Sequence, residues 1–131
     1  MHTPHLLGKG DVLIIDEPEA HLHPENQRLI ARVLVRLMNA GVRVVCATHS
    51  SLILHQMSNH TLATASGRLD EVGFAEHDRL DLDNIGVYLF ELSEDGTHVK
   101  EVEVDAEFGI SEDEFVRVAD QIGDETYQLV T

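Results

Sequence analysis

A strand–helix–strand pattern over residues 12–47 constrains the fold of this 131-residue chain more than any other feature. The apolar run at 12–15, with charged residues on both sides, is typical of a strand buried on both faces of a parallel sheet. Apolar residues then recur at helical spacing from Pro24 to about Asn39, and a second apolar strand follows at 43–47. Two strands joined in this way run parallel, with a right-handed crossover. The sequence therefore predicts an α/β fold with a largely parallel sheet.

Local signals mark both ends of the predicted helix. Pro24 suits the first helical position, where a missing N–H group costs nothing, and Glu25 suits the positive N-terminal end. His23, directly before Pro24, is expected to cap the helix or to pack against the turn. Gly41 is expected to end the helix.

Residues able to carry chemistry follow the two strands directly. Asp16 and Glu17 come after the first strand, and Thr48 and His49 come after the second. Because the carboxyl ends of parallel strands meet at one edge of a sheet, both pairs should lie where open α/β sheets bind ligands. A carboxylate fixed at a strand end can hold Mg²⁺ beside nucleotide phosphates, and its neighbour can deprotonate an attacking water. Four apolar residues followed by Asp-Glu form a Walker B pattern.

The run LIIDEPEAHLHP at 13–24, with ATHS at 47–50 on the next strand, resembles ABC-type P-loop ATPases. Within them it looks most like the prokaryotic group allied to the overcoming-lysogenisation-defect proteins and to the SMC and RecF heads. The resemblance is strong over residues 11–56 and weaker over 85–131. It implies a P-loop NTPase-like core, ATP and Mg²⁺ as cofactors, and ATP hydrolysis coupled to head-to-head association.

The resemblance also implies a role for each matching residue. Asp16 would bind Mg²⁺ through water beside the nucleotide, and Glu17 would be the catalytic carboxylate. His49 would hydrogen-bond the γ-phosphate or the attacking water, and Ser50 would support that nucleotide-binding loop. Residues 20–23, His23 included, would form the D-loop that crosses to the nucleotide of the opposite subunit.

A P-loop, which reads GxxxxGK followed by Ser or Thr, is missing from the sequence. The nearest run, Gly8-Lys9-Gly10, has Thr3 where the first glycine should be and Gly10 where the Ser or Thr should be, and it precedes a strand. The eleven residues before Val12 are also too few for the family's signature helix. We therefore expect residues 1–131 to be the C-terminal portion of an ATPase head.

Such a portion would need a homodimer or a partner chain that supplies Walker A and the signature motif, and it would meet DNA only through the completed assembly. The alternative is a non-hydrolysing interaction module that retains the ATPase scaffold and dimerises through residues 20–24. A metal site built from several histidines is a further alternative, although the first two would diverge on a turn. Its members would be His21, His23, His49 and His55.

Charge is distributed unevenly along the chain. The formal net charge is -15, and residues 66–131 carry the whole surplus. This argues against a nucleic-acid surface held by the chain alone, since phosphate binding needs clustered Lys and Arg. Arg28, Arg32 and Arg36 form a basic stripe along the predicted helix. We interpret the stripe as a solvated face, and the alternative is contact with DNA or with the acidic half.

The remaining chain carries weaker signals. Ser50 or Ser51 could cap a short helix that ends at Met57, and residues 58–84 give no clear pattern. Strands are predicted at 85–92 and 98–104, joined by the turn residues 94–96. A closing helix is predicted from Glu112 to about residue 129, with Ser111 and Glu114 as a capping box. The hairpin and this helix make up the second segment, 85–131, and residues 11–57 make up the first.

Two general features set the expected location. One cysteine, Cys46, cannot form an internal disulfide, and its apolar surroundings predict a buried, inert thiol. No run approaches the roughly 18 consecutive apolar residues that span a bilayer. A cytoplasmic protein without a membrane partner is therefore expected.

Overall fold

The computed structural model describes residues 6–111 and 113–130, with side chains described up to Ser111 and from Ala119 onward. The first half of the chain contains two strands and two helices in alternation. They are β1 (Val12–Asp16), α1 (Pro24–Asn39), β2 (Arg43–Ala47) and α2 (Ser51–Ser66). Three 3₁₀ turns follow, namely η1 (Leu69–Val72), η2 (Glu76–Asp78) and η3 (Leu82–Asn84). The chain then forms β3 (Val87–Ser93), β4 (Gly96–Val102), β5 (Val104–Asp105), β6 (Gly109–Ile110) and α3 (Asp113–Val130).

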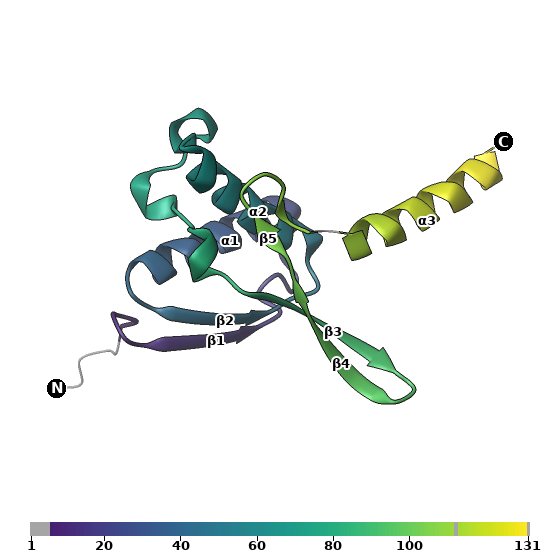
Figure 1. The fold of residues 1–131 in the computed structure, drawn as a ribbon, viewed down its shortest axis with the longest axis horizontal. Coiled ribbons are helices and arrows are strands. Elements are labelled where there is room, and N and C mark those ends of the chain that lie inside the picture. The colour runs from purple at the N-terminus through teal and green to yellow at the C-terminus, as the bar shows by residue number, and fades with distance from the viewer. Residues whose placement is uncertain (1–5, 112, 131) are drawn as a thin grey trace.

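The predicted βαβ unit is confirmed. β1 and β2 pair in parallel, from Val12 opposite Arg43 to Asp16 opposite Ala47. α1 crosses between them and lies along one face of this two-stranded sheet (Figure 1). The bounds of α1 are those that the sequence predicts, and the Nδ1 atom of His23 accepts a hydrogen bond from the Glu25 N–H group as the N-cap. Beyond the helix Gly41 adopts a φ of 94°, a backbone conformation that favours glycine.

The described residues differ from the predicted largely parallel sheet. They form three separate two-stranded sheets, of which only β1–β2 is parallel. The pairs β3–β4 and β5–β6 are antiparallel. A parallel partner needs a crossover of a dozen or more residues, whereas a short turn can join only antiparallel neighbours. After α2, short connections join β3 to β4 and β5 to β6, so the two strands of each pair are antiparallel.

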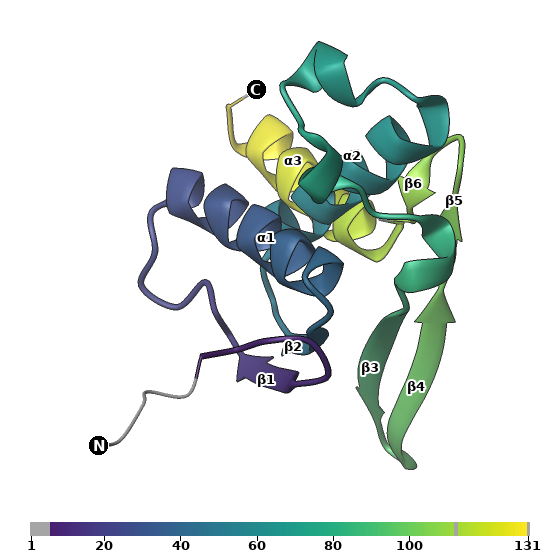
Figure 2. The ribbon, with the colours of Figure 1, turned by 90° about the vertical axis from the view of Figure 1, so that its left-hand side faces the viewer.

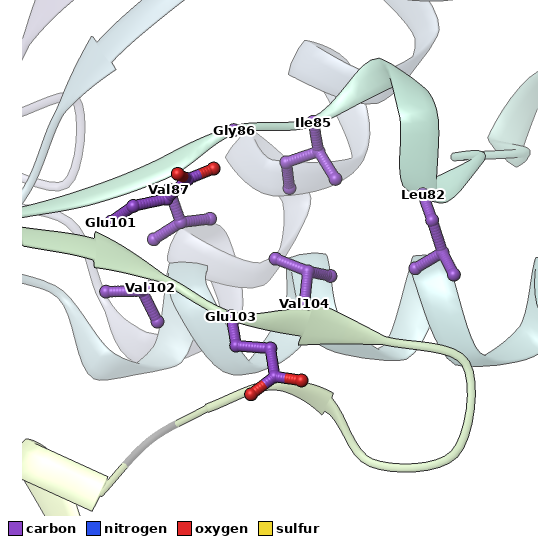
Figure 3. Close-up of a pocket in the computed structure, with 8 residues that line it drawn as sticks. All are labelled: Leu82, Ile85, Gly86, Val87, Glu101, Val102, Glu103 and Val104. Atoms are coloured by element: carbon purple, nitrogen blue, oxygen red, sulfur yellow. The ribbon is translucent and has the colours of Figure 1, made fainter.

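The predicted hairpin is confirmed as β3–β4, with Ser93 opposite Gly96. Its two turn residues lead into Gly96, whose φ of 122° favours glycine. One face of the hairpin carries apolar side chains that are exposed to solvent, namely Tyr88, Phe90, Leu92 and Val99. A hollow of about 410 Å³ lies at the base of the hairpin, where Ile85 and Val104 point toward each other (Figure 3).

α2 is more than twice as long as the helix predicted to end at Met57. Ser50 is its N-cap, and Gly67 ends it with a φ of 68°. The apolar periodicity fades in its second half because much of the buried surface there is polar. The buried polar residues of that half are Ser58, His60, Thr61 and Thr64. Their side chains are bonded within the chain: the hydroxyls of Thr61 and Thr64, for example, donate to the carbonyls of Ser58 and His60.

The core lies between α1, α2 and the segment that follows α2 (Figure 2). Its buried apolar residues are Ala31, Leu34, Val35, Val42, Ile53, Ala63, Phe74, Leu80 and Ile110. At its edge the His60 ring stacks on the Phe74 ring, with centroids 4.2 Å apart, and its Nδ1 atom bonds the Asp78 carbonyl at 2.8 Å. Burial is the main cause that lowers the pKa of His60, so this ring is neutral at pH 7.

Asp78 joins the acidic half of the chain to α1. Its carboxylate is fully buried, and it accepts hydrogen bonds from Arg32 at 2.8 Å and from Arg36 at 2.8 Å. The Ala75 N–H group donates a further bond at 2.9 Å. The interpretation of the arginine stripe as a solvated face is therefore wrong for two of its three members. They contact the acidic half, and Arg28 donates to the side-chain oxygen of Gln56 at 3.2 Å.

α3 projects away from the rest of the molecule (Figure 1). Residues 119–130 are exposed along their whole length, apolar side chains included. The capping box predicted at Glu114 lies outside the described side chains. Within the described part of the chain, no helix has both the length and the apolar character needed to cross a membrane.

We expect Asp78→Asn to lower the free energy of unfolding by about 2 kcal/mol at pH 7, because the substitution breaks a buried charge pair. The loss is limited because both guanidinium groups stay partly solvated. Although burial acts to raise it, the pKa of Asp78 is strongly lowered by its two arginine partners. Its contribution is therefore present above about pH 4 and is lost as the pH falls through the lowered value. Urea unfolding followed by circular dichroism measures the effect.

The matched control is Asp83→Asn, which neutralises an exposed carboxylate in the same segment. It should leave the unfolding midpoint nearly unchanged. Equal effects of the two substitutions would show that Asp78 does not anchor the acidic half to α1.

Candidate functional site

The parallel pairing brings the predicted site residues to one edge of the β1–β2 sheet. Asp16 is the last residue of β1 and lies opposite Ala47, the last residue of β2. The Glu17 N–H group donates to the Ala47 carbonyl at 2.8 Å, which extends the ladder by one bond. Beyond it, the Oε1 atom of Glu17 lies 3.6 Å from the Nε2 atom of His49. The Glu17 carboxylate and the His49 imidazole therefore lie together at this edge, and Asp16 directly precedes Glu17 at the end of β1.

The loop after β1 is folded back tightly. Glu17 has a φ of 47° and His21 a φ of 63°, a region that residues other than glycine seldom adopt. Two short backbone bonds close the loop, from Ala20 to the Glu17 carbonyl at 3.0 Å and from Leu22 to the Glu19 carbonyl at 2.9 Å. Backbone conformations of this kind persist only where the surrounding contacts hold them, and they are frequent at functional sites.

Glu19 belongs to the site although the sequence argument gave it no role. Its Oε1 atom accepts a hydrogen bond from the His49 backbone N–H group at 3.0 Å, across the two loops. Burial acts to raise the pKa of Glu19, but hydrogen bonds from backbone N–H groups and from Thr48 lower it overall. The carboxylate is therefore ionised at neutral pH. The available signal was its place in the loop, as a second acidic residue two positions after Glu17.

Gln27 is a second residue that the sequence argument missed. Its side-chain nitrogen donates to the Leu22 carbonyl at 3.1 Å, and its oxygen accepts from the Ser50 hydroxyl at 2.6 Å. The Ser50 oxygen in turn accepts from the Ile53 N–H group at 3.2 Å as the cap of α2. The first turn of α1 thus joins the loop after β1 to the loop after β2. A polar residue on the half-buried side of that turn was the available signal.

Two predicted site residues have local structural partners. The Ser50 hydroxyl is engaged by Gln27 and by the N-terminus of α2, so it supports the loop that carries His49. His23 uses its Nδ1 atom to cap α1 and is otherwise exposed.

Metal binding by the protein alone finds no support in the described residues. Nowhere among them do three His, Cys, Asp or Glu side chains gather as a metal site would require. The alternative built on four histidines is therefore not supported. Asp16, exposed at the end of β1, fits a different arrangement. Mg²⁺ is commonly held by one or two carboxylates together with substrate phosphates and water.

Cys46 lies on β2, near the carboxylates of this edge. Burial raises the pKa of its thiol, and the negative charges of Glu19 and Asp16 raise it further. The thiol therefore stays protonated at neutral pH and is a poor nucleophile. The raised pKa agrees with the predicted unreactive thiol, but Cys46 is half-buried, whereas the sequence predicts a buried one.

The Gly8-Lys9-Gly10 run forms a turn that leads into β1. Asp11 closes it by donating from its N–H group to the Gly8 carbonyl at 3.0 Å and by accepting from the Gly8 N–H group at 2.8 Å. The turn precedes the amino end of β1, whereas Asp16 and Glu17 lie at the carboxyl end. Thr3 lies outside the described residues.

Comparison with known proteins bears on residues 3–55. They match the family described as "AAA domain, putative AbiEii toxin, Type IV TA system". The chain is 36% identical over 64 residues to the cell division ATP-binding protein FtsE of Streptococcus pneumoniae, covering 49% of this chain and 28% of the relative. It is 32% identical over 62 residues to FtsE of Bacillus subtilis, covering 47% and 27%. The transport ATP-binding protein HisP of Salmonella typhimurium is 32% identical over 66 residues, covering 50% and 26%.

The matched region spans about a quarter of the length of these curated relatives. No solved structure matches the chain. The comparisons support a fragment of an ABC-type P-loop ATPase.

We expect Ser50→Ala to lower the free energy of unfolding by about 1 kcal/mol, since the substitution removes the N-cap of α2. It also removes the bond to Gln27. Ser51→Ala is the matched control, because Ser51 is the exposed first residue of the same helix, and it should change little. Chemical denaturation measures both variants, and a larger loss for Ser51→Ala would contradict the assignment of the cap.

Proposed function

We propose that this fragment of an ABC-type P-loop ATPase supplies the Walker B and switch-histidine half of an ATP-hydrolysing site. The observation that carries the proposal is the approach of the Glu17 carboxylate to the His49 imidazole, 3.6 Å apart at the carboxyl edge of two parallel strands. Ligands of α/β sheets bind at such edges. The relatives, which are named as ATP-binding proteins, add independent support.

Each residue would act through its own chemistry. Asp16 would hold Mg²⁺ through water, and the bound ion would neutralise charge on the phosphates. Glu17 would orient the attacking water and accept its proton, because its carboxylate points beyond the strand end and is half exposed. His49 would donate a hydrogen bond to the γ-phosphate or to the water. The loop 20–23 and Ser50 would hold these groups and, in a dimer, approach the nucleotide of the opposite subunit.

The proposed site needs groups that this sequence does not contain. A GxxxxGK segment is missing from residues 1–131, so the phosphate-binding loop and the signature motif would come from another segment or from a partner chain, a second copy of the head included. The exposed face of the β1–β2 sheet favours such a completion. Val12, Ile14 and Val45 are 54%, 77% and 58% exposed there, whereas parallel sheets are normally covered on both faces. The completed sheet would be the largely parallel one that the sequence predicts.

The amino-acid sequence of the loop after β1 favours one group within the ABC-type ATPases. Glu-Pro-Glu-x-x-Leu-His-Pro at 17–24 is the form found in the overcoming-lysogenisation-defect, SMC and RecF group that the sequence resembles. We assign residues 11–57 to its Walker B to switch-histidine segment and residues 85–131 to its C-terminal hairpin and helix.

A second candidate is a non-hydrolysing interaction module that keeps the ATPase scaffold and dimerises through residues 20–24. The observation in its favour is the missing GxxxxGK segment. Genomic sequence distinguishes the two candidates, because an in-frame GxxxxGK segment directly upstream favours the ATPase. If neither the upstream sequence nor a neighbouring gene encodes one, the scaffold is favoured.

For the chain of 131 residues, we expect Mg-ATP to bind with a dissociation constant of about 1 mM or weaker. The phosphate-binding loop and its lysine supply most of the electrostatic attraction for the nucleotide, and neither is encoded here. Isothermal titration calorimetry measures the affinity. A micromolar dissociation constant would overturn our account of which groups are missing.

In a complete head that includes a Walker A segment, Glu17→Gln should reduce ATP turnover at least about 100-fold while Mg-ATP binding is retained. The amide cannot accept the proton of the attacking water, whereas Asp16 is unchanged. ATP should then remain bound and the dimer should persist, which size-exclusion chromatography with bound-nucleotide analysis detects. Glu94→Gln, at the exposed turn of the hairpin, is the control. Normal turnover in Glu17→Gln would exclude Glu17 as the base.

A further inference from the structure

We propose that Glu19 is a positioning residue: by holding the backbone N–H group of His49, it fixes where the imidazole stands relative to Glu17. The inference rests on the proposed function of His49 and adds to it a residue that acts through His49. Glu19 itself would not touch the nucleotide.

Apart from Glu17, few groups hold the His49 ring in place. Its side chain is 89% exposed, so surrounding side chains do not confine the ring. The ring position therefore depends on the backbone at residue 49. There, the Glu19 carboxylate accepts the N–H group at 3.0 Å.

The Glu19 carboxylate is a strong hydrogen-bond acceptor. A hydrogen bond from a backbone N–H group to an ionised carboxylate is about twice as strong as a bond between neutral groups. The Ser50 N–H group donates to the Thr48 hydroxyl at 2.9 Å, and Thr48 lies near enough to the Glu19 carboxylate to help lower its pKa. The Glu19 carboxylate thus holds His49 directly, and the bond between Thr48 and Ser50 braces the same loop.

The loop after β1 carries both Glu17 and Glu19. The left-handed conformations of Glu17 and His21 fold the loop so that the first carboxylate faces the His49 ring and the second faces the His49 backbone. A movement of the loop would therefore displace the base and the histidine together. Gln27 adds a second link between the two loops, through Leu22 and Ser50.

A role for Glu19 as a second catalytic base does not fit its surroundings. Its carboxylate is half-buried, and its Oε1 atom already accepts the His49 N–H group, while Thr48 and the Glu19 backbone are further donors that lower its pKa. These donors stabilise the ionised form and lower its basicity, as the lowered pKa indicates. Glu17, which is 53% exposed and lies at the strand end, is better placed to meet a water.

The contact can be tested in the chain of 131 residues without nucleotide. Amide hydrogen exchange measured by NMR should be roughly tenfold slower at His49 in the wild type than in Glu19→Ala. Glu19→Gln should retain much of the protection, because its side-chain oxygen can still accept the bond. Glu25→Ala, an exposed carboxylate at the start of α1, is the control and should leave the exchange rate unchanged.

The consequence for function is tested in a complete head. Glu19→Ala should lower kcat for ATP roughly 10- to 100-fold, since small displacements of catalytic groups have effects of this size. KM should change less than about threefold, and Glu19→Gln should restore most of the activity. A loss of folded protein would instead reduce the active fraction and shift the unfolding midpoint, so that midpoint is measured for each variant.

The outcomes separate the two proposals. If His49 exchanges at the same rate in the wild type and in Glu19→Ala, or if Glu19→Ala hydrolyses ATP like an active wild type, Glu19 does not position His49. If the complete wild-type head does not hydrolyse ATP, the proposed function fails. The exchange measurement then still decides whether Glu19 holds the His49 backbone.

Discussion

Parallel pairing of β1 with β2 is the constraint on which the site depends. Because the two strands end at the same edge, the loops that follow them start one hydrogen bond apart, at Glu17 and Ala47. An antiparallel pair would have sent these loops to opposite edges. The crossover helix α1 enforces the parallel direction, and its first turn also supplies Gln27 to join the loops. One secondary-structure unit therefore sets both the direction of the strands and the spacing of the loops.

A second constraint attaches the acidic half of the chain. Asp78 is fully buried and meets two arginines from α1, so its desolvation is offset by charge and by hydrogen bonds. The His60 and Phe74 rings, stacked beside it, close the contact on the apolar side. Arg32 also lies 5.6 Å above the Phe74 ring. In a chain with a net charge of -15, one buried carboxylate thus holds the acidic half against α1.

Sequence reasoning succeeded where the signal is local. The bounds of α1, the His23 cap and the β3–β4 turn are encoded by neighbouring residues, and they were predicted. Sequence reasoning failed where the partner of a residue lies far away along the chain. Arg32 and Arg36 looked solvated because Asp78 lies more than 40 residues away, and the second half of α2 was missed because its buried face is polar. Glu19 had no assigned role, since its contact to His49 crosses between two loops.

Because the site is exposed to water, the positions of its side chains alone provide only weak electrostatic stabilisation. His49 is 89% and Glu17 53% exposed, so water screens the charges of these two side chains. Electrostatic stabilisation of a reacting phosphate is strong only in a water-excluded setting, where donors are already oriented. This chain contributes the orientation, through Glu19 and Gln27. The surface that brings the phosphate to His49 would also have to exclude the water. In the proposed ATPase, nucleotide binding and activation of the site would therefore happen in one structural step.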